Sequence, residues 1–159
     1  MSKLSHIDEE GKAHMVDVSE KPETERTATA QGSIFMQTKT MALITEGGAK
    51  KGDVLSVAQL AGIMGAKKAP ELIPLCHPLM LSSIDVELTC DEARLAVDIT
   101  ATCRLKGRTG VEMEALTAVS IAALTVYDML KAVDRGMRIS DIRLIRKEGG
   151  KSGVFETSE

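Results

Sequence analysis

The chain has 159 residues, of which 43% are hydrophobic and 27% charged, and its formal net charge is −3. This length suits a single domain with a substantial core. Modules that bind single-stranded nucleic acid need aromatic side chains on which bases stack. With no Trp, one Tyr, two Phe and a mildly acidic balance, the chain is a poor candidate for nucleic-acid binding.

The three cysteines, Cys76, Cys90 and Cys103, are odd in number and form no CxxC pair. A disulfide framework and a zinc ribbon are therefore disfavoured, and a reducing cytoplasm is the expected location. The N-terminal sequence MSKLSHIDEEGKAHMVDV lacks the apolar centre of a signal peptide, and no apolar run approaches the length of a membrane span. We expect a protein without a membrane segment.

Residues 1–25 are polar and rich in Glu and Lys. We expect them to form a largely flexible N-terminal arm that tightens at Met15–Val18. One domain is expected to follow, over residues 26–159. Its first strand is predicted at residues 26–37 (RTATAQGSIFMQ), which alternate loosely and carry Thr, Ile and Phe.

Two helices are predicted next. Thr38–Glu46 is a short helix that Gly47-Gly48 ends. Asp53 is placed to cap the N-terminus of a second helix, which runs to about Ala66. Apolar residues repeat along this helix at helical spacing, at Val54, Val57, Leu60, Ala61 and Met64.

A proline-rich segment follows, Pro70–Pro78 (PELIPLCHP), which holds one of only three histidines. Each proline fixes its φ at about −65°, removes a backbone donor and disfavours helix in the residue before it. We therefore predict a stiff, non-helical connector, packed down through its leucine and isoleucine side chains. Such a loop can hold a reactive side chain in a fixed position, and His77 is the candidate for that side chain.

The rest of the chain predicts a hairpin, a long helix and a final strand. Leu81–Thr89 and Arg94–Leu105 alternate with period two on either side of a short turn, which is typical of antiparallel strands. Thr109-Gly110-Val111-Glu112 matches a capping box, so the helix is predicted to begin there, and its apolar positions continue to Val133. Ile139–Lys147 is the last predicted strand and leads into a Gly-rich tail.

These elements alternate as β-α-β-β-α-β with an extra helix in the first crossover, the ferredoxin-like pattern. The predicted fold class is α+β, with a four-stranded antiparallel sheet packed on helices. Within the long helix, Ala115–Val126 contains no charged residue and is apolar on every side. One sheet covers only one face of such a helix, so we expect a partner copy on the other face and hence an oligomer.

His77 and Cys76 are the first candidates for chemistry. An isolated histidine is more often structural than catalytic, but the stiff flanks and the adjacent thiol keep a catalytic role open. A Cys–His metal pair is the weaker alternative, because sequence neighbours usually point apart and no other cluster of metal ligands is present.

Asp128 and Lys131 lie three apart near the end of the long helix and therefore share a face. They form either a solvated ion pair or, at the lip of a buried surface, an acid–base pair with shifted pKa values. Glu112 and Glu114 are in the first helical turn, where they favour the positive end of the helix dipole. Glu114 and Asp128 are about 21 Å apart along the helix, at about 1.5 Å per residue, so a site that uses both takes them from different protomers.

Two basic segments are candidate phosphate sites. Lys50 and Lys51 precede the second helix, where cations are unfavourable unless an anion is bound, and a solvated basic loop is the alternative. The tail RKEGGKSG is not a P-loop, because Ile145 stands where that motif needs its first glycine and no helix follows. A Gly-rich segment with Lys147 and Lys151 can still fold over a polyphosphate.

Two strings are long and unusual, LIPLCHPLMLS (Leu72–Ser82) and TGVEMEALTA (Thr109–Ala118). Shorter strings extend the pattern over nearly the whole chain: HMVDV (His14–Val18), KGDV (Lys51–Val54), AGIMGAKK (Ala61–Lys68), YDMLKAV (Tyr127–Val133) and GGKSG (Gly149–Gly153). Together they resemble the molybdenum-cofactor biosynthesis protein C family, the cyclic pyranopterin monophosphate synthases.

The resemblance implies a lyase that acts on the cyclised GTP derivative 3′,8-cyclo-7,8-dihydroguanosine 5′-triphosphate, which a radical-SAM enzyme makes in the preceding step. The implied products are cyclic pyranopterin monophosphate and pyrophosphate. The family is hexameric, a trimer of dimers, with active sites at subunit interfaces. The sequence requires no cofactor, although Mg²⁺ often accompanies triphosphates through phosphate oxygens and water, which leaves little trace in a protein sequence.

Carried over by position, the resemblance also implies a set of site residues. Those that contact substrate are Leu75, Cys76, His77, Met113 and Glu114. The catalytic residues are Asp128, as the principal one, Lys131 and His77. Those that complete the pocket are Lys51, Glu112, Lys147 and, as a phosphate contact, Arg26. We expect Asp128 and Lys131 to move protons at the ring, and Lys51, Lys147 and Lys151 to hold the triphosphate.

Two other functions are compatible with the residues. A non-catalytic nucleotide sensor binds the cyclised nucleotide and leaves it intact, because a fold alone does not settle function. In a scaffold subunit, Asp128 and Lys131 set the register of an interface, and Asp128→Asn then harms assembly more than activity. Release of pyrophosphate from the nucleotide distinguishes both from the lyase.

Overall fold

The computed structural model describes residues 4–47 and 53–158 and has a mixed α+β fold. Its elements in chain order are β1 (Thr24–Phe35), α1 (Thr38–Thr45), α2 (Val54–Lys67), α3 (Ala69–Leu72), β2 (Ser83–Asp91), β3 (Ala96–Gly107), α4 (Glu112–Leu130), β4 (Arg138–Glu148) and β5 (Phe155–Glu156). Each predicted strand and helix is present close to its predicted bounds.

One antiparallel sheet holds the described strands in the order β2-β3-β1-β4-β5. The prediction of four strands is wrong, because β5 adds a fifth at the edge of the sheet, with Phe155 opposite Lys147 of β4. A run of two residues is too short to show a period-two pattern. The sequence therefore carries no local signal for this strand.

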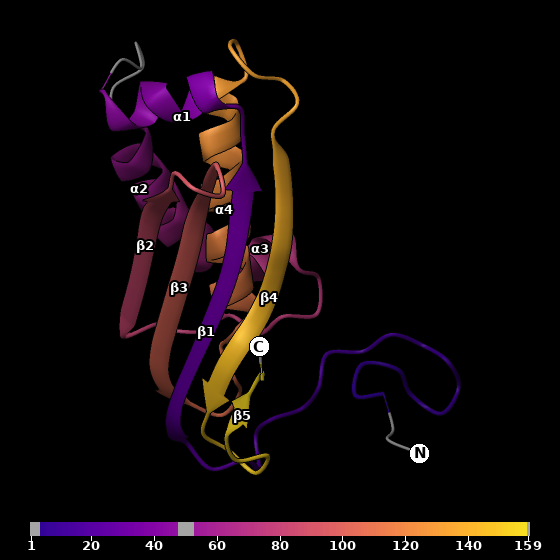
Figure 1. The fold of residues 1–159 in the computed structure, drawn as a ribbon. Coiled ribbons are helices and arrows are strands. Elements are labelled where there is room, and N and C mark those ends of the chain that lie inside the picture. The colour runs from indigo at the N-terminus through magenta and orange to yellow at the C-terminus, as the bar shows by residue number, and fades with distance from the viewer. Residues whose placement is uncertain (1–3, 48–52, 159) are drawn as a thin grey trace.

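The helices α2 and α4 cover one face of the sheet, and no helix of the described residues lies on the opposite face (Figure 1). On β1, Ala30 and Ile34 have no exposed surface. Gly32 lies between them, and a Cβ there would be 2.8 Å from side-chain carbons of both Ile142 and Val119. The missing side chain at Gly32 lets α4 lie close to the sheet.

Helix α2 packs against α4 at close range. A Cβ at Gly62 would lie 3.0 Å from the carbonyl oxygen of Ala118, and one at Gly65 would lie 2.8 Å from Cγ1 of Ile121. These two glycines therefore let the two helices approach more closely than larger residues would allow.

The N-termini of α2 and α4 differ from each other. The cap predicted for α2 is confirmed, since the Asp53 carboxylate accepts hydrogen bonds of 3.0 and 3.2 Å from backbone N–H groups in the first turn. The capping box predicted for α4 is wrong: the helix begins at Glu112, and Val111 occupies the N-cap position without a side-chain cap. The Glu112 carboxylate instead pairs with Lys147 of β4. The helix also ends earlier than predicted, at Leu130.

The proline segment is partly helical, which corrects the prediction of a wholly non-helical connector. Ala69–Leu72 forms α3 with Pro70 in its first turn, where the missing N–H of proline would be unpaired in any case. The irregular connector extends from Ile73 to the start of β2 and contains Cys76 and His77, both half-buried.

We expected α4 to need a partner copy because we assumed that only the sheet covers it within the chain. That assumption is wrong. The sheet covers one side of α4 and α2 covers another (Figure 1). Its strongly exposed large apolar side chains are Met113, at 36%, and Leu124, at 53%. Within the described ranges, α4 is also the one helix long and apolar enough to cross a membrane, and its place in the core accounts for that composition.

Gly65→Ala tests the close packing of α2 on α4. We expect it to lower the free energy of unfolding by about 1–2 kcal/mol, because overpacking against Ile121 outweighs the roughly 1 kcal/mol that alanine gains over glycine in a helix. In an Ile121→Ala background, where space is available, the same change should be stabilising. Urea unfolding of the wild type, both single variants and the double variant measures these effects, and stabilisation by Gly65→Ala alone would contradict the packing.

Candidate active site

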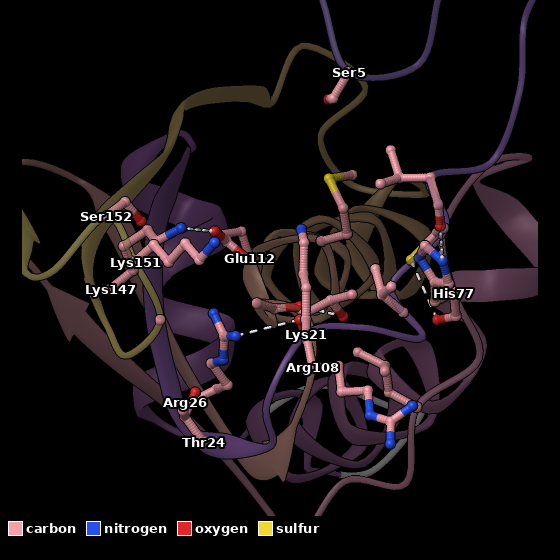
Figure 2. Close-up of a pocket in the computed structure, with 18 of the residues that line it drawn as sticks. Ser5, Lys21, Thr24, Arg26, His77, Arg108, Glu112, Lys147, Lys151 and Ser152 are labelled. Atoms are coloured by element: carbon pink, nitrogen blue, oxygen red, sulfur yellow. Dashed lines mark hydrogen bonds and ion pairs between the residues drawn. The ribbon is translucent and has the colours of Figure 1, made fainter.

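A cavity of about 630 Å³ (Figure 2) lies at the end of the sheet where β1 begins and where β3 and β4 end, which is the lower end of the sheet in Figure 1. Segments that are far apart in the sequence line it. They are the N-terminal arm, the start of β1, the connector after α3, the loop and first turn of α4, and the tail after β4.

The cavity brings together most of the predicted site residues. Those that line it are Arg26, Leu75, Cys76, His77, Glu112, Met113, Glu114 and Lys147. Lys51 lies outside the described residues. Asp128 and Lys131 are at the other end of α4 and do not line the cavity. Helix α4 thus presents its first turn to the cavity and its last turn elsewhere.

Glu114 is buried at the base of the cavity, with 2% of its surface exposed. Its Oε1 accepts a hydrogen bond of 3.6 Å from the Cys76 thiol, whereas Oε2 is buried without a partner among the described residues. Burial raises the pKa of Glu114. Burial and the neighbouring carboxylate raise the pKa of Cys76 to about 11. At neutral pH, Cys76 is therefore a neutral donor, and Glu114 keeps one buried carboxyl oxygen that no described residue hydrogen-bonds.

Glu112 and Lys147 form an ion pair at the wall of the cavity, with 27% and 22% of their side chains exposed. Gly110 leaves room for this pair, since a Cβ there would lie 2.7 Å from Cδ of Glu112. The pair joins the start of α4 to the end of β4. It therefore fixes two of the segments that form the site.

His77 is tied to the N-terminal arm. Its Nε2 lies 2.7 Å from the carbonyl oxygen of Val16, and Nε2 carries the hydrogen because a carbonyl oxygen only accepts. Other arm residues that line the cavity are Ser5, His6, Val18, Lys21 and Pro22. The sequence predicts a tightening at Met15–Val18 but not its position at the cavity. The apolar Val16 and Val18 in a polar stretch are the one local signal for it.

Cationic side chains outnumber carboxylates around the cavity. Those among the described lining residues are Lys21, Arg26, Arg108, Lys147 and Lys151, against the carboxylates Glu112 and Glu114. Arg26 donates through Nη2 to the carbonyl oxygen of Arg108 at 3.2 Å. This balance favours an anionic ligand. Lys21 and Arg108 are not among the predicted site residues, because no local sequence pattern marks either.

Asp128 and Lys131 form an ion pair of 2.6 Å, and both side chains are more than half exposed. The hydrogen bond from Lys131 and the charge of Asp128 raise the pKa of Lys131. Two interpretations were open for these residues, a solvated ion pair or an acid–base pair at a buried surface. Within the single chain they form a solvated ion pair, because no described residue buries them.

Cys76 and His77 point toward different partners. The sulfur faces Glu114 and the imidazole faces Val16, as is usual for sequence neighbours. Within residues 4–47 and 53–158, no group of three or more His, Cys, Asp or Glu side chains is arranged to hold a metal ion.

Glu114→Gln tests the burial of this carboxyl group. Because the folded-state pKa is raised from its ordinary value of 4.5, the folded protein binds the proton more tightly, and ionisation costs stability as the pH rises from that value through the raised pKa. The variant keeps the shape without the titration. We expect its Tm to exceed that of the wild type by about 2–6 °C at pH 8 and by much less at pH 4.

The matched control is Glu112→Gln, which removes the partner of Lys147 and should lower the Tm at pH 8. Thermal unfolding of the three proteins between pH 4 and pH 8 makes the comparison. A difference between Glu114→Gln and the wild type that is the same at both pH values would contradict the assignment.

Comparison with known proteins places the chain among close relatives. The model of the MoaC family matches residues 15–150. The chain is 63% identical over 158 residues to a protein of Cereibacter sphaeroides named cyclic pyranopterin monophosphate synthase, with 99% of each chain covered. It is 65% identical over 155 residues to the protein of that name from Rhodospirillum rubrum, with 98% of this chain and 93% of the relative covered.

A third relative of the same name, from Parvibaculum lavamentivorans, is 59% identical over 154 residues, with 97% of this chain and 96% of the relative covered. The identity therefore extends over nearly the full length of all three relatives, and the family model covers the sheet from β1 to β4 and both long helices. The chain therefore belongs to the MoaC family.

Proposed function

We propose that this chain is a cyclic pyranopterin monophosphate synthase of molybdenum cofactor biosynthesis, a lyase that converts 3′,8-cyclo-7,8-dihydro-GTP into cyclic pyranopterin monophosphate and pyrophosphate. The relatives named for this synthase match the chain over nearly its whole length. The observation that carries the proposal is that Leu75–His77 and Met113–Glu114 meet at one cavity. A radical-SAM enzyme supplies the substrate, and the reaction takes place in the cytoplasm.

The fold that goes with this function is ferredoxin-like. The strand order β2-β3-β1-β4 supports it, as do the positions of α2 between β1 and β2 and of α4 between β3 and β4. Strand β5 is then an addition at the edge, and it holds the tail beside the cavity.

The two sides of the cavity suit the two ends of the substrate. Arg26, Lys147 and Lys151 lie together on one side (Figure 2), and cations there stabilise the charge that develops on departing pyrophosphate. His77 lies on the opposite side, where Cys76 contacts Glu114. Opening the purine and closing the pterin move several protons, and these groups can donate and accept them.

Asp128 and Lys131 act in the site of a second protomer. The helix separates Asp128 from Glu114 by about 21 Å along its axis, which supports this arrangement. The exposure of the ion pair in the single chain supports it as well. Burial against another protomer opposes the rise in the pKa of Lys131 that its contact with Asp128 causes.

Exposed apolar side chains on α2 support an oligomer. Val57, Leu60 and Met64 are 42%, 58% and 56% exposed, and their spacing places them on one side of the helix. A contiguous apolar surface of this kind is typical of an interface. The assembly that we propose is the hexamer of the family, a trimer of dimers with active sites between subunits.

The test of the function is a reaction of the purified protein with the cyclised nucleotide, followed by assays for pyrophosphate and for the pterin product. Binding without conversion would identify a sensor instead, and neither binding nor conversion would favour a scaffold subunit. Repeating the reaction with EDTA tests whether Mg²⁺ is needed. Normal turnover by Lys131→Ala in a correctly assembled hexamer would remove Lys131 from the mechanism.

Mixed oligomers test whether each site draws on two protomers. We expect Glu114→Ala and Asp128→Ala to reduce turnover at least about a hundredfold when each is alone. Hexamers that contain both variants in equal amounts should recover up to about one quarter of wild-type activity, because that fraction of sites takes each residue from a protomer that retains it. The specific activity of co-expressed, doubly tagged hexamers measures this recovery.

Asp128→Ala mixed with Lys131→Ala is the matched control. Both residues reach a given site from the same protomer, so every site in these hexamers lacks one of them and no recovery is expected. Absence of recovery in the Glu114–Asp128 mixture would contradict the inter-subunit site, provided that both tags are present.

A further inference from the structure

The tail turn Gly149-Gly150 lies against the side chain of Arg26. Both glycines have a positive φ, +99° and +77°. We propose that Gly150 is a positioning residue: its missing side chain lets the Arg26 guanidinium lie across the tail and face the cavity, where it binds the polyphosphate end of the substrate. The identity of that ligand rests on the proposed function.

The register of the sheet places the tail beside Arg26. At the end of the ladder between β1 and β4, Thr27 lies opposite Glu148, so the two glycines follow next to Arg26. A Cβ at Gly149 would overlap the carbonyl oxygen of Glu25 and would lie 3.1 Å from Cδ of Arg26. The tail backbone at Gly149 therefore lies against the aliphatic part of the Arg26 side chain, and the next residue, Gly150, lies farther along the same side chain.

Gly150 meets the guanidinium group itself. A Cβ there would overlap Nη1 of Arg26 and would lie 2.8 Å from Cζ and 3.1 Å from Nη2. On its other side, Nη2 donates to the carbonyl oxygen of Arg108, so the guanidinium is held between two backbone segments. Any side chain at position 150 displaces the guanidinium first, because the end of a flexible side chain moves more readily than the backbone.

Arg26 keeps its charge available to a ligand. None of the ion pairs within the described ranges includes it, and its Nε is buried without a partner among those residues. Lys147, on the same side of the cavity, is paired with Glu112. A guanidinium held by backbone rather than by a carboxylate offers its planar array of N–H donors to phosphate oxygens.

The tail contains a matched control for Gly150. Gly153 also has a positive φ, +67°, but a Cβ there would meet nothing within 4 Å. Gly150→Ala and Gly153→Ala therefore impose a similar backbone cost, and only the first reaches Arg26. We expect Gly150→Ala to weaken the binding of inorganic pyrophosphate to the assembled protein at least about tenfold, and Gly153→Ala to change it less than about twofold, by isothermal titration calorimetry.

A double-mutant cycle assigns the loss to Arg26. In an Arg26→Ala background, Gly150→Ala should cause no further loss of pyrophosphate affinity, because the group that it displaces is absent. Additive losses in the cycle would overturn the proposal. Equal losses in the two glycine variants would overturn it too, as would a wild-type protein that does not bind pyrophosphate.

Steady-state kinetics separate this proposal from the proposed function. Gly150→Ala should lower the kcat/KM for the cyclised nucleotide by at least the factor by which it raises the Kd for pyrophosphate. If pyrophosphate binding follows the cycle but the nucleotide is not converted, the proposed function fails and the role of Gly150 stands. If Gly150→Ala converts the nucleotide with the kcat/KM of the wild type, the role of Gly150 fails and the proposed function stands.

Discussion

The close contact of α4 with both the sheet and α2 is the constraint on which the cavity depends. The fully buried small residues of α4 are Ala115, Ala118, Ala122 and Ala123. On the neighbouring elements, Gly32 of β1 leaves room for the side chain of Val119, and Gly62 of α2 leaves room for the backbone of α4 at Ala118. Small residues make many short-range contacts that a larger side chain would break. Because α4 is held on two sides, its first turn lies at a fixed place beside the connector, and Glu114 meets Cys76 there.

Local patterns were sufficient to predict the longer elements, though not α3 or β5, and insufficient to predict how the elements pack. Asp53 indicates the start of α2, and period-two alternation indicates β2 and β3, because each signal lies within the structure that it specifies. The capping box fails because Glu112 has a partner in a distant strand, Lys147. The cover of α4 by α2 was missed for a similar reason, since the periodicity of one helix does not say which other helix packs on it.

Residues of the candidate site could be predicted from the sequence where they stand in an unusual local sequence context. The prolines around His77 and the first helical turn that holds Glu114 are contexts of this kind, and both residues line the cavity. Lys21 and Arg108 line it as well, but their positions depend on the path of the whole chain. The distance of Asp128 from Glu114 followed from helix geometry alone.

The Cys76 thiol shows what its surroundings mean for oxidative chemistry. With a pKa of about 11, roughly one molecule in 10⁴ carries the thiolate at pH 7. Hydrogen peroxide and electrophiles react with the thiolate and hardly at all with the thiol. Although it lines a cavity that admits small molecules, Cys76 is thus a poor target for sulfenylation or alkylation. Burial, together with the nearby carboxylate of Glu114, disfavours the thiolate and thereby protects the sulfur from oxidants.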